Sequence, residues 1–288
     1  MNIYSQGLVS GLISGASYAL LGVGLVLVYR TTKILNLAHG ETFVIAAVMT
    51  HLLTGAGVPL YAAALIGAMV TVLAYWSLQE FALEKRNTWP IGSLILITLG
   101  AAFLVRGALV LLIGSDPISI PPLIKGRPLI LFGAAVPLQG AVLIVVGFSV
   151  SLAVTVFLSR TRLGKELVAT AENPAAAQLL GINTGLARSV AYAISGGIGA
   201  LAAVLLVPLI SIDYNSGLSM TIRGFIAASI AGMSAGRTVA AALLLGVLES
   251  YVAVFFGALL QDPVIFGLLI AIALWQSRRI RYGGAVRA

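Results

Sequence analysis

The 288-residue sequence contains no cysteine, only two histidines and few charged side chains. Without cysteine it forms neither a disulfide nor a thiolate metal site, and it has no cysteine nucleophile. Two histidines alone do not complete a zinc site. Charged residues make up 9% of the chain, against roughly 25% in an ordinary soluble domain. A water-facing surface of this size requires more ionisable side chains, which excludes a soluble globular protein.

Apolar residues are correspondingly abundant. They make up 60% of the chain, whose mean hydropathy is +1.07. A lipid bilayer requires apolar side chains on the outside of a protein as well as the inside. Because several apolar runs have about the length that a helix needs to cross a bilayer, roughly 20 residues, we expect an all-α polytopic membrane protein.

The apolar runs predict one transmembrane domain, residues 1–288, built as a bundle of eight or nine helices. The first six residues carry no basic cluster or cleavage site, so we expect the first span to stay in the mature protein. The run 222–233 is short for a crossing and is expected to be a broken or re-entrant helix. The other expected spans are residues 7–29, 34–53, 60–83, 90–113, 138–158, 187–212, 239–258 and 263–276.

The basic residues predict the orientation. They lie between apolar runs rather than on a soluble module, so we expect no nucleic-acid partner. All but four of the 17 lie in segments that one orientation places on the same side of the membrane. By the positive-inside rule that side is the cytoplasm, so we expect a protein of the cell inner (plasma) membrane with its C-terminus in the cytoplasm. An outside N-terminus follows if 222–233 crosses fully. The connection 114–137 is too rich in proline for a continuous helix and has an alternating stretch at 128–132, so we expect an external loop with a short hairpin.

Small residues and a weak internal repeat predict how the bundle packs. Gly7, Gly11 and Gly15 recur at intervals of four, which lets helix backbones approach closely. Tyr18-Ala19 opens a helix that ends before a polar break at 36–41. Tyr192-Ala193 similarly opens one that ends before 213–217. Paired interrupted segments in two halves are typical of transporter pathways.

Five ionisable residues fall at membrane depth, where each costs roughly 2.5 to 3.5 kcal/mol near a helix centre. One interpretation is that they pair with one another and hold helices together. The other is that some of them line a solute pathway. The segment 36–41 is expected to leave helix geometry and start a new helix whose positive end faces an anion, or else to be a plain interfacial loop. The five residues are His39, Glu41, Arg106, Arg223 and Glu249.

The polar stretch 159–184 is longer than a connector between two spans requires. It predicts two short helices, Lys165 to Thr170 and Pro174 to Leu180, with Asn173 capping the second and Gly181 ending it. A capped insert favours a docking site over a solvated loop.

No sequence feature supplies energy or hydrolytic chemistry. Gly164-Lys165 lacks the upstream glycine and the following Ser or Thr of a phosphate-binding loop. A serine elbow and paired carboxylates in a soluble cleft are also absent. We therefore expect no enzymatic activity and no cofactor on this chain, and any ATP must bind to another chain.

Three groups of residues, spread over nearly the whole chain, carry a resemblance. They are Tyr18-Ala19-Leu20 with Asn36-Leu37-Ala38-His39-Gly40-Glu41; Thr161-Arg162-Leu163-Gly164-Lys165 with Ala169-Thr170-Ala171-Glu172-Asn173 and Ala176-Ala177-Gln178-Leu179-Leu180-Gly181-Ile182-Asn183; and Gly246 with Glu249. In these positions the sequence resembles the permease subunits of branched-chain amino acid ABC importers, whose relatives handle other amino acids, urea and short amides.

The resemblance implies an alternating-access permease that works with other chains. These are a second permease subunit, identical or different, two ATPase subunits that bind ATP and Mg²⁺, and an external solute-binding protein that meets loops 114–137 and 213–217. It also implies that 159–184 is the cytoplasmic coupling segment docked on the ATPase. The predicted coupling residues are Gly164, Lys165, Glu172, Asn173, Ala176, Ala177, Gly181 and Ile182, and the predicted pathway residues are Asn36, His39, Gly40, Glu41 and Glu249.

Two other functions stay open from the residues alone. An autonomous ion-coupled secondary transporter or channel would use His39, Glu41 and Glu249 as relay groups. An intramembrane enzyme would use His39 and Glu249 as an acid and base pair, but no nucleophile or metal-ligand set accompanies them.

Overall fold

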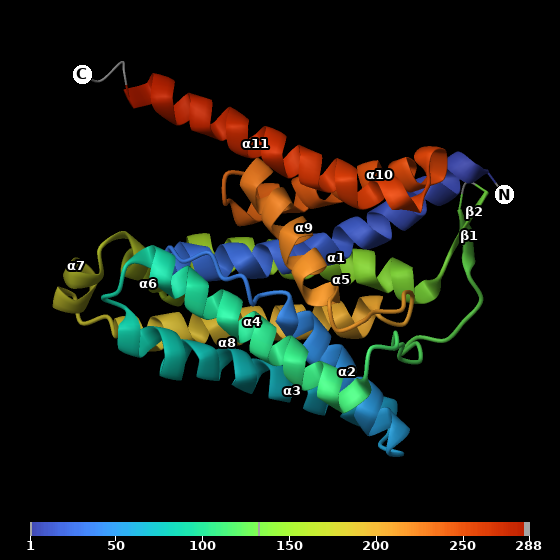
Figure 1. The fold of residues 1–288 in the computed structure, drawn as a ribbon, viewed down its shortest axis with the longest axis horizontal. Coiled ribbons are helices and arrows are strands. Elements are labelled where there is room, and N and C mark those ends of the chain that lie inside the picture. The colour runs from blue at the N-terminus through green and yellow to red at the C-terminus, as the bar shows by residue number, and fades with distance from the viewer. Residues whose placement is uncertain (1, 132, 285–288) are drawn as a thin grey trace.

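The computed structural model describes residues 2–131 and 133–284, and the side chains of the predicted basic tail after residue 276 lie outside the described part. The chain is mostly helical (Figure 1). The helices are α1 (Ile3–Thr32), α2 (Glu41–Gly55), α3 (Leu60–Ser77, extended by turns to Arg86), α4 (Ile91–Ile113), α5 (Leu138–Arg160), α6 (Arg162–Glu172), α7 (Pro174–Leu179), α8 (Thr184–Leu206), α9 (Ser216–Ile230), α10 (Ala235–Phe256) and α11 (Gln261–Gly284). Strands β1 (Leu129–Leu131) and β2 (Ala134–Val136) form the short antiparallel hairpin that the sequence predicts.

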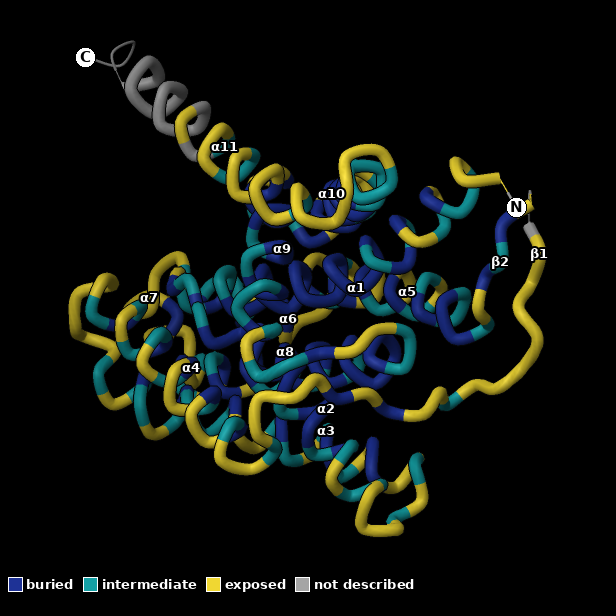
Figure 2. The backbone as a smooth tube through the Cα atoms, turned by 45° about the vertical axis from the view of Figure 1, so that its right-hand side comes forward, coloured by how far each residue is buried: buried dark blue, intermediate teal, exposed yellow. Residues whose placement is uncertain are grey.

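Six helices of the described chain are long and apolar enough to cross a membrane: α1, α3 with its extension, α4, α5, α8 and α10. Helix α2 and the stretch Ala258–Ile272 are shorter apolar helices. The most apolar window of α1 is 89% buried and that of α8 is 72% buried, whereas those of α3, α4 and α5 are 28% buried. Helices α1 and α8 therefore form the centre of the bundle, as their largely buried backbone shows (Figure 2), and α3, α4, α5 and α10 carry exposed apolar residues.

Glycines bring α1 and α10 into backbone contact, as the four-residue spacing predicts. A Cβ built on Gly11 would lie 2.6 Å from the Cα of Val247, and one on Gly15 would lie 2.8 Å from the Cα of Leu243. Gly246 on α10 packs in turn against the backbone of Gly11 and Gly15. Larger residues at these positions would force the two helices apart.

The weak repeat in the sequence corresponds to two similar units. Helix α1 is followed by a break and the 15-residue α2, and α8 is followed by a break and the 15-residue α9. The two short helices contact each other, and α9 crosses α1 obliquely on its way toward α10 (Figure 1). The broken elements therefore meet inside the bundle.

Two predicted boundaries in the second unit are wrong. The span expected at 187–212 ends at Leu206, because Pro208 has no amide hydrogen to donate to the carbonyl of Val204. The Gln139 side-chain amide donates to that carbonyl instead, at 3.4 Å, and to the carbonyl of Leu205 at 3.0 Å. The short helix expected at 222–233 begins six residues earlier, at Ser216, where Gly217 is buried against the Glu41 carboxylate of α2.

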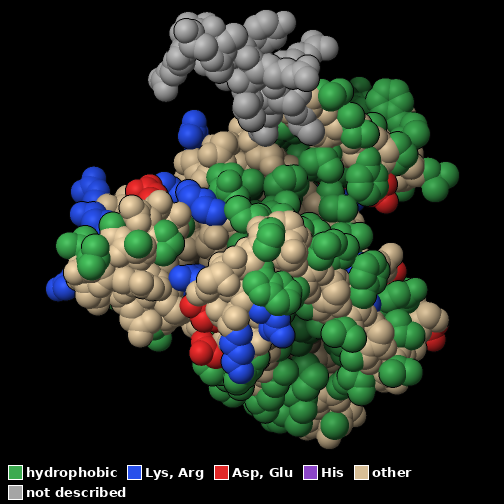
Figure 3. All heavy atoms as spheres, turned by 60° about the vertical axis from the view of Figure 1, so that its left-hand side comes forward, with side chains coloured by type: hydrophobic (Ala, Val, Ile, Leu, Met, Phe, Trp, Pro, Cys, Tyr) green, Lys and Arg blue, Asp and Glu red, His purple; other side chains and the backbone are tan. Residues whose placement is uncertain are grey.

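The insert α6–α7 and the β-hairpin lie at opposite ends of the molecule (Figure 1). At the hairpin end, Asn2 donates to Gly133 through the backbone, and Ile118 pairs with Ile212 in an isolated bridge. At the other end, α6 packs against α5, α1 and α8. The view toward this end shows Lys and Arg side chains gathered around it and hydrophobic side chains over much of the remaining surface (Figure 3). The molecule thus has two chemically different ends.

Candidate functional site

The first buried ion pair joins Glu41 on α2 to Arg106 on α4. Arg106 donates to Glu41 Oε1 through Nη2 at 2.7 Å and through Nε at 2.9 Å, and both side chains are buried. The Glu41 carboxylate also lies against Gly217, in the first turn of α9. The positive end of a helix dipole favours a carboxylate there. The helix that the sequence predicts after segment 36–41 is α2, which begins at Glu41; the Glu41 carboxylate itself lies at the start of a different helix, α9.

His39 lies at the same break, fully buried between α1, α3 and α8. Its Nε2 is 2.9 Å from the carbonyl of Leu21, and its Nδ1 is 3.2 Å from the hydroxyl of Tyr75. Since a carbonyl only accepts, Nε2 carries a hydrogen and donates to Leu21. Nδ1 also lies 3.4 Å from the hydroxyl of Ser195 on α8, so His39 ties three helices together.

Asn36 and Gly40 complete the break between α1 and α2. Asn36 Oδ1 accepts from the backbone amide of Ala38 at 2.8 Å, which turns the chain toward α2. The Gly40 amide donates to Thr221 Oγ1 at 2.7 Å, and a Cβ on Gly40 would collide with the carbonyl oxygen of Gly217. The segment is therefore buried rather than a plain interfacial loop, and it holds the start of α9.

The second buried ion pair joins Arg223 on α9 to Glu249 on α10. Arg223 Nη2 donates to Glu249 Oε1 at 2.6 Å, and Nε donates to both carboxylate oxygens at 3.0 and 3.2 Å. The hydroxyl of Tyr18 on α1 donates to Glu249 Oε2 at 2.8 Å, and Asp262 on α11 accepts from Arg223 Nη2 at 2.9 Å. One guanidinium thus connects α9, α10 and α11. The pairing interpretation of the membrane charges holds for both arginines.

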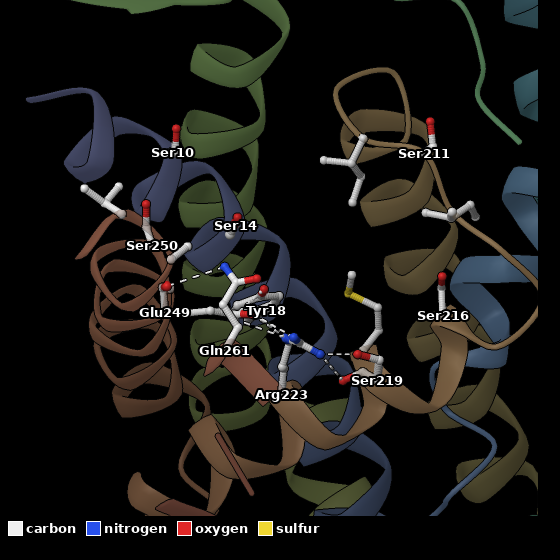
Figure 4. Close-up of a pocket in the computed structure, with 16 residues that line it drawn as sticks. Ser10, Ser14, Tyr18, Ser211, Ser216, Ser219, Arg223, Glu249, Ser250 and Gln261 are labelled. Atoms are coloured by element: carbon white, nitrogen blue, oxygen red, sulfur yellow. Dashed lines mark hydrogen bonds and ion pairs between the residues drawn. The ribbon is translucent and has the colours of Figure 1, made fainter. Parts of the chain in front are cut away.

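A cavity of about 530 Å³ opens beside this second pair, between α1, α9, α10 and the start of α11. Arg223 and Glu249 are in contact at its wall, and Gln261 and Tyr18 lie close to them (Figure 4). The lining is unusually rich in serine and includes an apolar group contributed mainly by residues after α8 and the end of α10. The lining residues are Ser10, Ser14, Tyr18, Ile210, Ser211, Ile212, Ser216, Ser219, Met220, Arg223, Gly246, Glu249, Ser250, Ala253, Val254 and Gln261.

The structure separates the predicted pathway residues into two groups. Glu249 lines the polar cavity. Glu41 instead borders a more apolar cavity of about 350 Å³ between α2, α3 and α4. Helix α9 connects the groups, because its first turn contacts Gly40 and Glu41 while Arg223, farther along the helix, holds Glu249.

The sequence did not single out the rest of the polar cavity as a site. Ser10, Ser14 and Tyr18 recur at intervals of four, which places them on one face of α1. That spacing is a signal that sequence reasoning had available. Gln261 and Ser211 carry no comparable signal, because their position depends on how the helix ends pack.

The insert predicted from 159–184 forms as two helices. The side chain of Thr161 accepts from the amide of Gly164 at 3.0 Å and caps α6. Asn173 accepts from the amide of Ala176 at 3.0 Å and caps α7, which begins at Pro174. Gly181 follows α7 with a positive φ of 80°, a conformation that favours glycine. Of the predicted coupling residues, Lys165, Glu172, Asn173, Ala176 and Gly181 are exposed, Ile182 is half-buried, and Gly164 and Ala177 are buried.

Comparison with known proteins gives the family. Residues 7–273 match the family described as branched-chain amino acid transport system, permease component. The chain is 30% identical to the high-affinity branched-chain amino acid transport system permease protein LivH of Escherichia coli, over 94% of this chain and 93% of LivH. It is 32% identical to the corresponding protein BraD of Pseudomonas aeruginosa, over 95% and 94% of the two chains.

Solved structures show the same fold at low sequence identity. PsaBC from Streptococcus pneumoniae in complex with Fab matches with a TM-score of 0.51 and 10% identity, over 95% of this chain and 91% of that one. An inward-facing ABC transporter of metal-chelate type matches with a TM-score of 0.50 and 17% identity, over 93% and 86%. Sequence and fold agree, and the chain belongs to the family of permease components of branched-chain amino acid transport systems.

Proposed function

We propose that this chain is the membrane permease of an ATP-driven importer for branched-chain or closely related amino acids, in the inner (plasma) membrane. The observation that carries the proposal is the likeness over more than nine-tenths of the chain to LivH and BraD, both named for that transport. A permease component does not hydrolyse ATP itself. In the proposed complex, ATP and Mg²⁺ bind to separate ATPase subunits, a second permease subunit completes the membrane part, and an external binding protein delivers the solute.

Within the permease, we assign the polar cavity beside Glu249 to the solute pathway. Its volume lies in the usual range of ligand cavities, roughly 300 to 1,000 Å³, and polar groups from α1, α9, α10 and α11 converge on it. The remaining predicted pathway residues support the pathway indirectly, because they fix the start of α9. They are Asn36, His39, Gly40 and Glu41. A displacement of α9 would then change the cavity, which is what alternating access requires.

We assign the capped insert α6–α7 to coupling with the ATPase. Leu179 and Leu180 at the end of α7 are 90% and 80% exposed, and they lie outside the apolar surface of the helix bundle. Two exposed leucines on a rigidly capped helix favour a protein partner over water. Because basic residues gather at this end, we place it, together with the C-terminus, on the cytoplasmic side. The hairpin end then faces outward, toward the binding protein.

The transport function is tested in vesicles that contain the complete complex. We expect uptake of labelled leucine that requires internal ATP, the ATPase subunits and the external binding protein, with vesicles lacking the ATPase as the control. The isolated chain should hydrolyse no ATP. Leucine uptake by this chain alone, driven by a proton or sodium gradient, would instead establish the secondary-transporter alternative.

A further inference from the structure

We propose that the cavity beside Arg223 and Glu249 binds the charged backbone of a free amino acid, its α-ammonium and α-carboxylate together. This inference rests on the proposed function and deepens it. It gives the permease a recognition site of its own, in addition to any site on the binding protein. The group that this site recognises is the charged backbone, which all free amino acids share.

The charges of the cluster leave room for an ammonium group. Arg223 supplies one positive charge, while Glu249 and Asp262 supply two carboxylates that share its Nη2 nitrogen at 2.6 and 2.9 Å. One negative charge is therefore in excess. When a substrate ammonium pairs with Glu249, Arg223 keeps Asp262 as its partner, so neither buried charge is left unpaired.

The other edge of Arg223 is available to a carboxylate. Its Nη1 donates to the carbonyl oxygen and the hydroxyl of Ser219, both of which are neutral acceptors. Hydrogen bonds from a guanidinium to a carboxylate are roughly twice as strong as those between neutral groups. A substrate carboxylate that enters the cavity can thus replace Ser219 at this nitrogen.

The remaining lining fits an amino acid with an apolar side chain. No hydrogen-bond partner is found within the described residues for the hydroxyls of Ser10, Ser14 and Ser211, so these groups are free to solvate the charged backbone. Ile212, Met220 and other apolar residues line the same cavity. They offer an apolar surface to the substrate side chain. The site should therefore accept leucine, isoleucine and valine alike.

The absence of cysteine from the chain allows a direct binding test. The variant Ser10→Cys carries one thiol in the cavity, and its reaction with a small thiol reagent is followed in the purified permease complex. We expect leucine to slow this reaction by about tenfold at roughly tenfold excess over its Kd. Leucinamide, which lacks the carboxylate, and 4-methylpentanoate, which lacks the ammonium, should not protect. The control variant Ser159→Cys, at the far end of α5, should react at a rate that leucine does not change.

Two further variants test the assigned charges. Glu249→Gln in the Ser10→Cys background keeps the size of the side chain and one acceptor oxygen but removes the excess negative charge, so protection by leucine should be lost. Glu80→Gln, in the extension of α3, removes a carboxylate that lies outside the cavity lining and should retain protection. Equal protection by 4-methylpentanoate, or undiminished protection in Glu249→Gln, would overturn the proposal. The comparison of the three ligands on Ser10→Cys decides the question even if Glu249→Gln does not fold.

The outcome separates this inference from the proposed function. If the complex takes up leucine but leucine does not protect Ser10→Cys, the zwitterion site is wrong and the transport function stands. If the complex takes up no branched-chain amino acid and another amino acid protects Ser10→Cys, the substrate assignment fails and the zwitterion site stands.

Discussion

At the residue scale, the two buried ion pairs give the few charges of this chain distinct tasks. The Arg106–Glu41 pair lies against the start of α9, and the Arg223–Glu249 pair lies beside the polar cavity. In both, an arginine contacts a carboxylate through two nitrogens: Arg223 reaches both oxygens of Glu249, whereas Arg106 donates twice to Oε1 of Glu41. A lysine would offer a single nitrogen in place of these two.

The Arg106–Glu41 pair makes a prediction about stability. Arg106→Met leaves the Glu41 carboxylate buried without its partner, which should destabilise the protein by about 3 to 5 kcal/mol. The double variant Glu41→Met/Arg106→Met removes both charges and should recover most of that loss, since a buried pair replaced by apolar residues is often neutral. Thermal unfolding in detergent measures both effects. A single variant as stable as the wild type would show that the pair is hydrated rather than buried.

Whether the sequence predicts the role of a residue depends on whether local sequence or tertiary packing determines the position of that residue. The buried charges and the caps Asn173 and Gly181 are recognisable locally, because an ionisable residue in an apolar run or a capping residue at a helix end is a feature of the sequence itself. The partner of each charge cannot be recognised locally, since Arg106 and Glu41 lie 65 positions apart and meet only when α4 packs on α2. The cavity is likewise a product of packing, as its serines come from four separate segments.

At the element scale, α9 is the helix on which both sites depend. It contacts the α1–α2 break through Gly217 and Thr221, passes Gly22 of α1 at Gly224, and reaches α10 at Arg223. Apolar length alone predicts the long helices well but places the start of α9 too late. The reason is that its first turn is polar and is stabilised by buried partners that apolar length does not reveal.

The seating of α9 makes a second prediction. A Cβ at Gly40 would collide with the carbonyl oxygen of Gly217, so Gly40→Ala should push α9 away from α2. Overpacking of this kind typically destabilises by about 1 to 3 kcal/mol, and leucine uptake should fall with it. Gly107→Ala on α4 is the matched control, because nothing lies within 4 Å of its Cβ. Equal effects of the two substitutions would mean that α9 does not pack closely at Gly40.

The insert α6–α7 makes a third prediction, on assembly. Leu179→Asp places a charge on the exposed end of α7, where it should prevent co-purification of the ATPase subunits while the permease still folds. Ile130→Asp on the hairpin is the control, since that side chain is also highly exposed but lies at the opposite end of the molecule. Retention of the ATPase by Leu179→Asp, or its loss from Ile130→Asp, would contradict the assignment of the coupling surface.

At the scale of the whole molecule, the two ends of the bundle define its orientation. Basic side chains gather around α6 and α7, and the hairpin end carries the first residues of α1 and the loop that follows α8. The positive-inside rule places the end with more Lys and Arg in the cytoplasm. In the orientation proposed above, the start of α1 lies outside and the end of α11 inside, an arrangement that requires an odd number of crossings.

The lack of cysteine turns this orientation into a direct measurement. Leu179→Cys should react with a membrane-impermeant maleimide only after the cells are opened, because α7 is proposed to face the cytoplasm. Ile130→Cys should react in intact cells, because the hairpin is proposed to face outward. Both side chains are highly exposed, so accessibility of the thiol differs only through the membrane. The unsubstituted chain should not react and serves as the background. The reverse pattern would mean that the molecule has the opposite orientation in the membrane. The docking surface of α7 would then lie where no cytoplasmic ATPase could reach it.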